Sequence, residues 1–300
     1  MANIFVIGDV MLDMDIDVTP RDNQEGAVLC LAGSAPRYYA GGAANTAKLL
    51  AYLGHNVGLY GLVSTDWRTQ ELFHKLSGCM NICLWPGLDE TPLKIRTYQN
   101  GRISLRLDME SPPPNHITKQ PSAPIKEALR TGSGQPPDAI VFVNYNKGVF
   151  NEHTREAIEE MLSWGCVTVL DPKPCDYNYI WDGVDVVTPN ELESSQISIA
   201  AEHQVVTQGG KGCYILSQTI SGQMLQYPNL LNTAPVTDPQ VVGAGDAFTA
   251  KLSSALVDGE NLVQAAGMAT KFATEYVAKS RTEFWLLADA VIGADDTTSN

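Results

Sequence analysis

Short apolar segments alternate with helix-like segments along most of the chain. Six apolar segments of four or five residues are typical of buried parallel strands, and they lie at residues 4–8, 57–61, 139–143, 167–170, 184–187 and 204–207. Helical segments are predicted at residues 42–53, 67–76 and 152–164. In the first of them, apolar positions recur near helical spacing and Gly54 follows as a stop signal. Because strands that alternate with helices form βαβ units, we predict an α/β fold with a doubly wound, mostly parallel sheet flanked by helices.

Two segments interrupt this alternation and predict a small β-rich unit beside the main sheet. Residues 14–39 contain few helical signals, and residues 94–108 have alternating runs on both sides of Asn100-Gly101. An Asn-Gly pair in this setting is the strongest short-range indication of a β-hairpin. We therefore expect a main α/β domain and a β-rich flap, at residues 1–13, 40–88 and 112–300 for the domain and 14–39 and 89–111 for the flap.

The composition excludes several classes of protein. The 300 residues are 44% hydrophobic and 18% charged, which is enough apolar surface for a large core. The net charge is −14 and no basic cluster is present, so neither nucleic acid nor an anionic membrane is an expected partner. No apolar run approaches the ~18 residues of a spanning helix, and the first residues favour a core strand over a signal peptide. With its six cysteines scattered, the chain is predicted to be cytoplasmic.

A run of small residues, Gly243-Ala244-Gly245, precedes Asp246 and an apolar stretch that extends to Val257. Small residues directly before a helix let backbone N–H groups point at an anion, and the helix dipole adds attraction. A phosphate held there would place Asp246 within reach of an attacking hydroxyl, whose proton the carboxylate could accept during phosphoryl transfer. The same pattern also fits an acidic residue that only stabilises the start of a helix, and spacing alone leaves both interpretations open.

A second glycine-rich stretch, residues 207–212, lies between two strand-like segments. It is not a Walker A loop, because Gly212 follows Lys211 where Ser or Thr is required. No G-x-G-x-x-G motif follows the first strand, so a dinucleotide site is only weakly indicated. From the residues alone, this stretch is either a nucleotide-contacting turn or a plain hairpin.

Five motifs together resemble those of the ribokinase-like (PfkB) sugar kinases in order and approximate spacing, over roughly residues 3–280. The matching stretches are Gly8-Asp9-Val10-Met11-Leu12-Asp13, Gly41-Gly42-Ala43-Ala44-Asn45, Asp171-Pro172-Lys173, Thr188-Pro189-Asn190-Glu191-Leu192-Glu193 and Gly243-Ala244-Gly245-Asp246-Ala247-Phe248. With Asn144-Tyr145-Asn146-Lys147-Gly148, their wording is most similar to the kinase half of bacterial heptose kinase–adenylyltransferases. The nucleotidylyltransferase half of those proteins has no counterpart in this sequence.

The resemblance implies roles at the acceptor side of the site. Asp246 matches the catalytic base of the family, and the matching anion hole is formed by Gly243, Ala244 and Gly245. The matching sugar contacts are Asp13, Gly41, Gly42 and Asn45. A carboxylate and an amide suit a polyol, because each accepts hydrogen bonds from hydroxyls and the amide also donates.

The resemblance also implies ATP and Mg²⁺ as cofactors. The matching nucleotide loop contains Thr207, Gly209 and Gly212, and Lys173 is a further candidate for contacting the nucleotide. Asn190 and Glu193 match an N-x-x-E motif that helps to hold Mg²⁺, usually through water, as a hard cation prefers.

If the acceptor is a sugar phosphate, its phosphate needs a cationic partner. Lys147 follows a predicted strand, and the predicted hairpin contributes Lys94, Arg96, Arg102 and Arg106. Of these we select Lys147, Arg96 and Arg106 as substrate-binding candidates. Each of these basic residues also fits a solvated surface charge.

The chain departs from the family pattern at three places. Gln240 stands where the family usually has an Asp that helps to bind a monovalent cation, so that cation site is expected to be weak or absent unless Asp238 replaces it. Only 13 residues separate Glu193 from Thr207, so one peripheral helix of the relatives is expected to be missing. Asn144 stands where the most similar relatives tend to have Asp.

These observations predict an ATP-dependent kinase that phosphorylates a sugar or sugar phosphate. The leading candidate substrate is heptose 7-phosphate, which would give the 1,7-bisphosphate. The resemblance implies that the flap acts as a lid that excludes water, and that it supplies the interface of a homodimer. Two alternatives stay open: a kinase for another sugar such as fructose, ribose or a nucleoside, and a non-catalytic relative that binds sugar or nucleotide and regulates a partner.

Overall fold

A nine-stranded sheet forms the centre of the computed structural model, which describes residues 1–23, 26–76, 80–110, 123–132, 134–218, 224–230, 236–237 and 239–295. The strand order is β14-β13-β12-β11-β10-β9-β1-β5-β6. The strands are β1 (Asn3–Gly8), β5 (Asn56–Val63), β6 (Met80–Pro86), β9 (Ala139–Val143), β10 (Val167–Asp171), β11 (Val186–Val187), β12 (His203–Thr207), β13 (Cys213–Gln218) and β14 (Met224–Leu230). All pairings from β12 to β6 are parallel, and only β12–β13 and β13–β14 are antiparallel.

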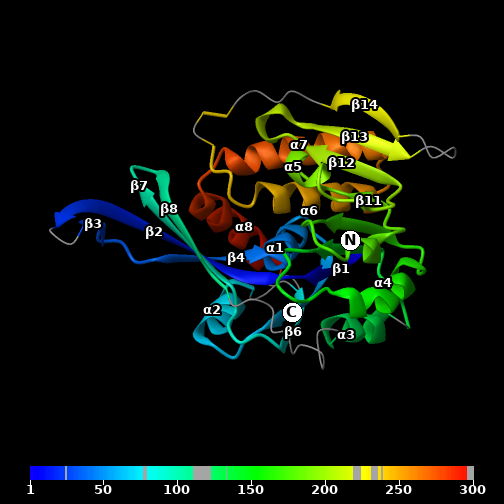
Figure 1. Cartoon of the computed structure of the whole chain (residues 1–300), viewed down its shortest axis with the longest axis horizontal. Helices are drawn as coiled ribbons and strands as arrows, with labels where there is room; N and C mark the ends of the chain where they lie inside the picture. The colour runs from blue at the N-terminus through cyan, green and yellow to red at the C-terminus, as the bar shows by residue number, and fades with distance from the viewer. Residues whose placement is uncertain are drawn as a thin grey trace.

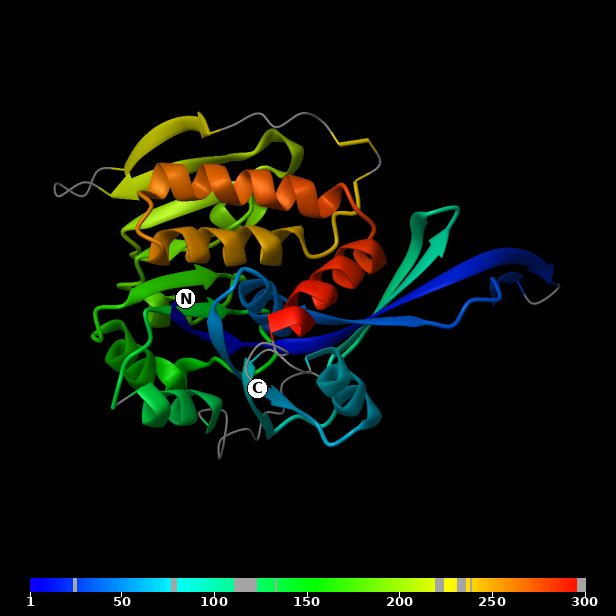
Figure 2. The same cartoon turned by 180° about the vertical axis from the view of Figure 1, so that it is seen from behind.

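Helices cover both faces of this sheet (Figures 1 and 2). Alternate side chains of β1 enter different cores: Ile4 and Val6 face one, and Phe5 and Ile7 face the other. The first face is covered by α1 (Ala43–Tyr52), α6 (Ala244–Val257), α7 (Leu262–Val277) and α8 (Arg281–Asp295), and the second by α3 (Ala123–Gly132) and α4 (Arg155–Leu162). The remaining helices are α2 (Trp67–Leu76), α5 (Glu191–Ser194) and the 3₁₀ turns η1 (Glu152–Thr154), η2 (Asn178–Trp181) and η3 (Gly209–Lys211). The predicted α/β fold with a doubly wound, mostly parallel sheet is confirmed.

A second sheet extends away from the body (Figure 1). Its strand order is β3-β2-β7-β8, and β4 pairs with the first part of β2. The strands are β2 (Val10–Asn23), β3 (Gly26–Leu31), β4 (Arg37–Gly42), β7 (Leu93–Gln99) and β8 (Arg102–Met109). The predicted hairpin is confirmed: β7 and β8 are antiparallel, and Asn100 and Gly101 between them have φ values of 52° and 78°, as a tight hairpin turn requires. This sheet is called the lid below.

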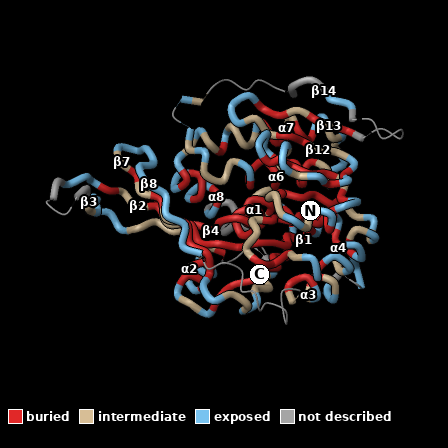
Figure 3. The backbone as a smooth tube through the Cα atoms, viewed as in Figure 1, coloured by how far each residue is buried: buried red, intermediate tan, exposed pale blue. Residues whose placement is uncertain are grey.

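The two faces of the lid differ in polarity. On one face, Asp13 and Asp15 of β2 lie beside Lys94 and Arg96 of β7, and all four are buried. The other face, here called the apolar lid face, consists of Leu29, Leu31, Leu105, Leu107 and Met109. These five side chains are exposed, and Leu105 and Leu107 are 54% and 52% exposed. The strand β8 that carries three of them is coloured as exposed in Figure 3. The lid therefore directs its charged face toward the body and presents an apolar face to solvent.

Some expectations fall outside or at the edge of what the structure describes. Within the lid, β2 begins at Val10, β4 ends at Gly42 and β8 ends at Met109. The predicted domain boundaries at 13/14, 39/40 and 111/112 remain our proposal. Residues 111–122 and Asp238 lie outside the described residues. The stretch from Glu191 to Thr207 is fully described and contains α5 but no second helix, as expected. Among the described residues, no helix is both long and apolar enough to cross a membrane.

Candidate active site

Asp246 lies in the first turn of α6, buried behind the glycine that begins this helix. Gly243 has φ +83°, and a Cβ there would lie 2.7 Å from the hydroxyl of Tyr276 and 2.9 Å from Nδ2 of Asn45. Glycine is therefore required by both the backbone and the packing. Two residues later, a Cβ on Gly245 would have no described atom within 4 Å, so this side of the helix start faces open space.

Two side chains from distant parts of the chain bind the Asp246 carboxylate. Nδ2 of Asn45 donates to Oδ2 at 2.7 Å, and the hydroxyl of Tyr145 donates to Oδ1 at 3.1 Å. Burial raises the pKa of Asp246, and these two hydrogen bonds oppose the rise because they favour the ionised form. Oδ1 of Asn45 is buried without a hydrogen-bond partner among the described residues, which leaves an acceptor for a ligand next to Asp246.

Asp13 lies on the charged face of the lid between two arginines. Nη2 of Arg281 donates to Oδ2 of Asp13 at 2.6 Å and to the carbonyl of Ala40 at 3.2 Å. Nη1 of Arg96 lies 3.2 Å from Oδ1 of Asp13. A Cβ on Gly41 would lie 3.1 Å from Cγ of Asp13. The structure thus brings together Asp13, Gly41 and Asn45, which were predicted to contact the sugar.

Gly42 ends β4 immediately before α1, with φ +58°. A Cβ on this residue would lie 2.5 Å from the carbonyl oxygen of Asp9, so any side chain would separate β4 from the end of β1. That carbonyl accepts the N–H of Ala43 at 3.0 Å, which starts α1. Gly42 is therefore needed to present Asn45 on the first turns of α1.

The predicted phosphate-binding cations already have carboxylate partners. Nζ of Lys147 lies 2.6 Å from Glu110, and Nη2 of Arg106 lies 2.6 Å from Asp108. Arg96 is paired with Asp13 as described above. An anionic ligand would therefore have to compete with or rearrange these pairs, and the three residues stay candidates.

Asn190 and Glu193 bind each other at the start of α5. The Asn190 side chain accepts the N–H of Glu193 at 2.9 Å, and Oε2 of Glu193 accepts the N–H of Asn190 at 2.9 Å. Nζ of Lys173 is paired with Oε1 of Glu193. Both carboxylate oxygens of Glu193 thus already have a partner, but each keeps a further lone pair that can accept a hydrogen bond. This donor set suits the outer shell of a hydrated Mg²⁺ better than direct ligation.

A second buried carboxyl, that of Asp171, lies near Asp246, Lys173 and Glu193. Burial raises the pKa of Asp171 to about 8, because the attraction of Lys173 only partly offsets desolvation and the repulsion from Asp246 and Glu193. Burial alone would lower the pKa of Lys173, but Asp171 and Glu193 raise it above its ordinary value. The acidic groups at this edge of the sheet thus hold Lys173 in its charged form.

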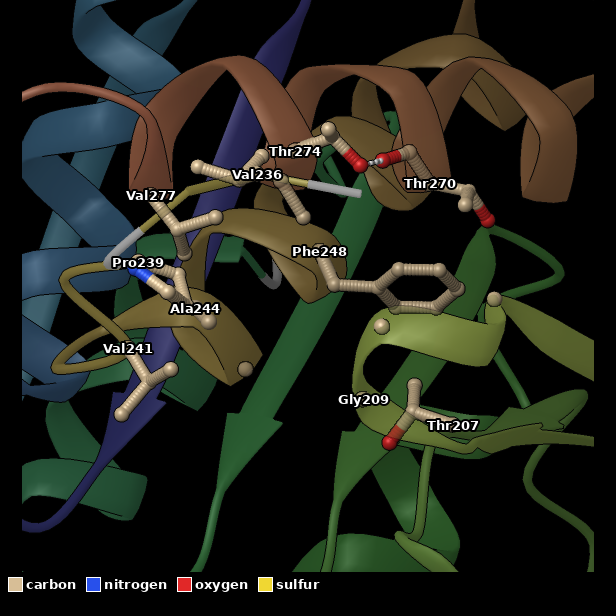
Figure 4. A pocket seen from close by; sticks show the side chains of 14 residues that line it. Thr207, Gly209, Val236, Pro239, Val241, Ala244, Phe248, Thr270, Thr274 and Val277 are labelled. Carbon is tan, nitrogen blue, oxygen red and sulfur yellow. Dashed lines mark hydrogen bonds between the residues drawn. The ribbon is translucent and has the colours of Figure 1, made fainter. Parts of the chain in front are cut away.

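A cavity of about 310 Å³ adjoins the start of α6 (Figure 4). Thr207, Gly209 and Gly212 of the predicted nucleotide loop line it together with Ala244 and Gly245. Its other walls are mainly apolar and include Val241, Phe248, Ala273 and Val277. The β12–β13 connection is thus a hairpin that also borders a cavity, so the two interpretations of this stretch are compatible. An apolar cavity next to a helix start can hold a planar ring with its phosphates toward the helix.

Gln240 donates its backbone N–H to the carbonyl of Val277 at 2.9 Å, close to this cavity. Its neighbour Pro239 lines the cavity, whereas Asp238 lies outside the described residues.

A family model described as pfkB family carbohydrate kinase matches residues 138–287, half of the chain. The chain belongs to the pfkB family. This family is described as one of carbohydrate kinases, the enzyme class that was predicted from the five motifs.

This pfkB-family chain is similar in sequence and in fold to several individual proteins. Bifunctional protein HldE of Vibrio cholerae serotype O1 is 28% identical over 315 residues, which cover 99% of this chain and 65% of that protein. The chain thus spans less than two thirds of the length of this curated relative. The structure of phosphofructokinase-2 from Escherichia coli in complex with potassium has a TM-score of 0.74, with 18% identity and 94% of both chains covered. Ribokinase from Thermotoga maritima has a TM-score of 0.69, with 17% identity, and covers 98% of this chain and 99% of its own. The ribokinase-like fold is confirmed.

Three residues of the site were not predicted. Tyr145 belongs to the matching stretch at residues 144–148, from which only Lys147 was selected. The sequence therefore indicated that Tyr145 lies near the site but did not indicate its role. Arg281 has no motif around it, and Asp9 was noted only as part of the first matching stretch. The hydrogen bond between Arg281 and Asp13 joins residues 268 positions apart, and only the fold reveals it.

Proposed function

We propose that this pfkB-family kinase transfers the γ-phosphoryl group of ATP to a sugar hydroxyl with Asp246 as general base. The observation that supports this best is the placement of Asp246: it is buried, held by Asn45, and lies one residue from the cavity wall at Gly245. A carboxylate in this position is within reach of both a hydroxyl at Asn45 and a phosphate at the start of α6. General-base catalysis of this kind typically contributes 10²–10⁴-fold to the rate.

In this proposal the nucleotide occupies the cavity between the β12–β13 hairpin and α7, with its phosphates toward Gly243, Ala244 and Gly245. The sugar lies between Asp13 and Asn45, where Oδ1 of Asn45 accepts one of its hydroxyls. Asp246 takes the proton of the acceptor hydroxyl while the hydroxyl oxygen bonds to the γ-phosphorus and the bond from that phosphorus to the bridging oxygen breaks. ADP then leaves with both electrons of the broken bond, and the backbone N–H groups at the helix start stabilise the transferred phosphoryl oxygens.

Asn190 and Glu193 would hold Mg²⁺ through water in this proposal. The ion would neutralise charge on the nucleotide phosphates. Lys173, which lies between Glu193 and Asp171, would present a fixed positive charge to the same phosphates. The lid would exclude water over the bound sugar, so that ATP is not hydrolysed instead.

For the acceptor, we propose heptose 7-phosphate, converted to the 1,7-bisphosphate. The support is the identity of 28% to a protein named HldE across almost the whole chain, and the shared wording of the motifs. Lys147, Arg96 and Arg106 are the proposed partners of the 7-phosphate, after exchange of their present carboxylate partners. A kinase for fructose, ribose or a nucleoside uses the same base and anion hole, so the substrate has to be tested directly.

The test is an ADP-release assay with purified protein, ATP and Mg²⁺ against a panel of sugars and sugar phosphates. We expect turnover with heptose 7-phosphate and a product that carries a second phosphate on the anomeric carbon, identified by ³¹P NMR. Turnover with a different sugar would refute the heptose assignment but keep the kinase mechanism. If ATP binds but no member of the panel is phosphorylated, the mechanism is refuted and a regulatory binding role takes its place.

We further propose that two chains dimerise through the apolar lid face. Its five exposed apolar residues lie on one face of a single sheet, on the edge strands β3 and β8, and exposed apolar surface of this kind marks an interaction site. A two-fold interface would place this surface against itself.

In sedimentation velocity, the wild-type chain should behave as a dimer and Leu105→Glu as a monomer, because an interface cannot bury unpaired carboxylates. Leu192→Glu is the control, since Leu192 is 67% exposed but lies on α5, outside the lid. A monomeric wild type, or a dimeric Leu105→Glu variant, would contradict the proposal.

A further inference from the structure

One buried carboxylate, that of Asp9, accepts three backbone N–H groups of the loop that follows β9. Oδ2 of Asp9 accepts the backbone N–H groups of Tyr145 at 2.7 Å and Lys147 at 3.0 Å, and Oδ1 accepts the N–H of Val149 at 3.2 Å. Asp9 is 1% exposed. Asn146, in the middle of the loop, has φ 57°, a conformation that non-glycine residues rarely adopt. A strained loop of this kind persists only where its surroundings fix it, and here Asp9 does so through three hydrogen bonds.

The loop presents one side chain, that of Tyr145, to the proposed base. Its hydroxyl donates to Oδ1 of Asp246 at 3.1 Å. The ammonium of Lys94 lies 4.9 Å and that of Lys173 lies 5.2 Å from the centre of its ring, so the ring is held by cation–π contacts. Burial and the charges of Asp246 and Asp171 raise the pKa of Tyr145 well above its ordinary value, so its hydroxyl remains a donor at neutral pH.

From these contacts we infer that Tyr145 is a positioning residue for the reaction, which holds one oxygen of Asp246 in place, and that Asp9 acts through Tyr145. The inference rests on the proposed role of Asp246 as general base. Asn45 fixes Oδ2 and Tyr145 fixes Oδ1, so the carboxylate cannot rotate. Its remaining lone pairs then face a fixed direction, which a proton acceptor needs because small misplacements of reacting groups cost large factors in rate.

The hydrogen bond from Tyr145 also favours the ionised form of Asp246, and its loss therefore raises the pKa of that carboxyl. Several other groups act on the same carboxyl and are unchanged when the Tyr145 hydroxyl is removed. They are Asn45 of α1, Asp13 of β2, Asp171 at the end of β10, Lys173 just beyond it, Tyr276 of α7 and Arg281 of α8. A base must be deprotonated to act, so the acidic limb of the kcat/KM profile should move to higher pH when the hydroxyl is lost.

The decisive variant is Tyr145→Phe, which removes the hydroxyl but keeps the ring between Lys94 and Lys173. For the acceptor found in the panel, we expect kcat to fall about tenfold or more and the acidic limb to shift upward by about one pH unit, the scale of a lost hydrogen bond to a charged group. The KM for ATP should stay within about twofold. The matched control is Tyr179→Phe, because Tyr179 is exposed and stacks on Arg155 away from Asp246. A Tyr145→Phe enzyme with the wild-type kcat and pH profile would overturn the inference.

A double-mutant cycle tests the role of Asp9. Asp9→Asn keeps the shape of the side chain but leaves one acceptor oxygen in place of two, so the loop loses part of its support. If Asp9 acts through Tyr145, adding Tyr145→Phe to Asp9→Asn should lower kcat by much less than Tyr145→Phe alone does. Multiplicative effects of the two changes would refute that part of the inference. An inactive wild type would instead refute the proposed function, so the two failures are distinguishable.

Discussion

Replacing Asp246 with asparagine should lower kcat by at least about 100-fold, the lower end of general-base contributions. The asparagine side chain has nearly the same shape and keeps an oxygen that accepts from Asn45, so the start of α6 should stay folded. It has no proton affinity comparable to that of a carboxylate, and the acceptor hydroxyl then loses its proton without help. ATP binding should be nearly unchanged, because the cavity walls do not include residue 246.

The measurement is steady-state kinetics with the acceptor found in the panel, together with calorimetric titration of ATP. Asp258→Asn is the matched control, since Asp258 is an exposed residue at the C-cap position, at the other end of α6. Near-normal turnover by the Asp246→Asn enzyme would show that another group removes the proton. Asp171, the nearby buried carboxyl, would then be the next candidate to examine.

The second large effect is expected on stability rather than on rate. Asp13→Ala should lower the free energy of unfolding by about 3–5 kcal/mol, the usual cost of removing one member of a buried ion pair. Arg96 and Arg281 are both buried and would lose the carboxylate that lies between them. Arg281 would keep its 3.2 Å hydrogen bond to the carbonyl of Ala40 and its position over the ring of Tyr39, neither of which supplies a negative charge. Urea unfolding at neutral pH measures this loss as a lower midpoint.

Asp17→Ala is the matched control on the same strand. Asp17 pairs with Arg37, but the two side chains are 39% and 33% exposed, and such pairs contribute less than about 1 kcal/mol. The contrast between the two variants therefore isolates the effect of burial from the effect of deleting a carboxylate. Equal losses in both would contradict the assignment of Asp13 as a buried link between two arginines.

The sequence predicted the central strands well, because a strand buried on both faces is a continuous apolar run. Residues 139–143 coincide with β9, and residues 67–76 coincide with α2. The prediction was less accurate at residues 184–187, which contain only the two-residue strand β11, although this strand is buried in the interior of the sheet. The sequence pattern also did not predict that β2 continues for 14 residues from the body into the lid, because periodicity does not show which sheet a strand joins.

The candidate site was predicted where a local motif exists and missed where the fold alone creates the contact. Asn45 and Asp246 were both selected, although their hydrogen bond spans 201 positions and was not foreseen. Asn45 was expected to contact the sugar, and the structure adds that its amide also holds Asp246. Tyr145 and Arg281 act on Asp246 and Asp13 across 101 and 268 positions. Their roles depend on tertiary packing, which spacing along the chain does not encode.

The continuity of β2 has a mechanical consequence. β1 ends at Gly8 and β2 begins at Val10, so Asp9 alone separates the body from a 14-residue ribbon that leads to the outer end of the lid. Asp13 is the fourth residue of that ribbon, and its ion pair with Arg281 ties the base of the lid to α8 of the body. In the proposed mechanism, a sugar that contacts Asp13 would therefore contact the lid at the point where it joins the body, and its binding would act on the lid through this junction.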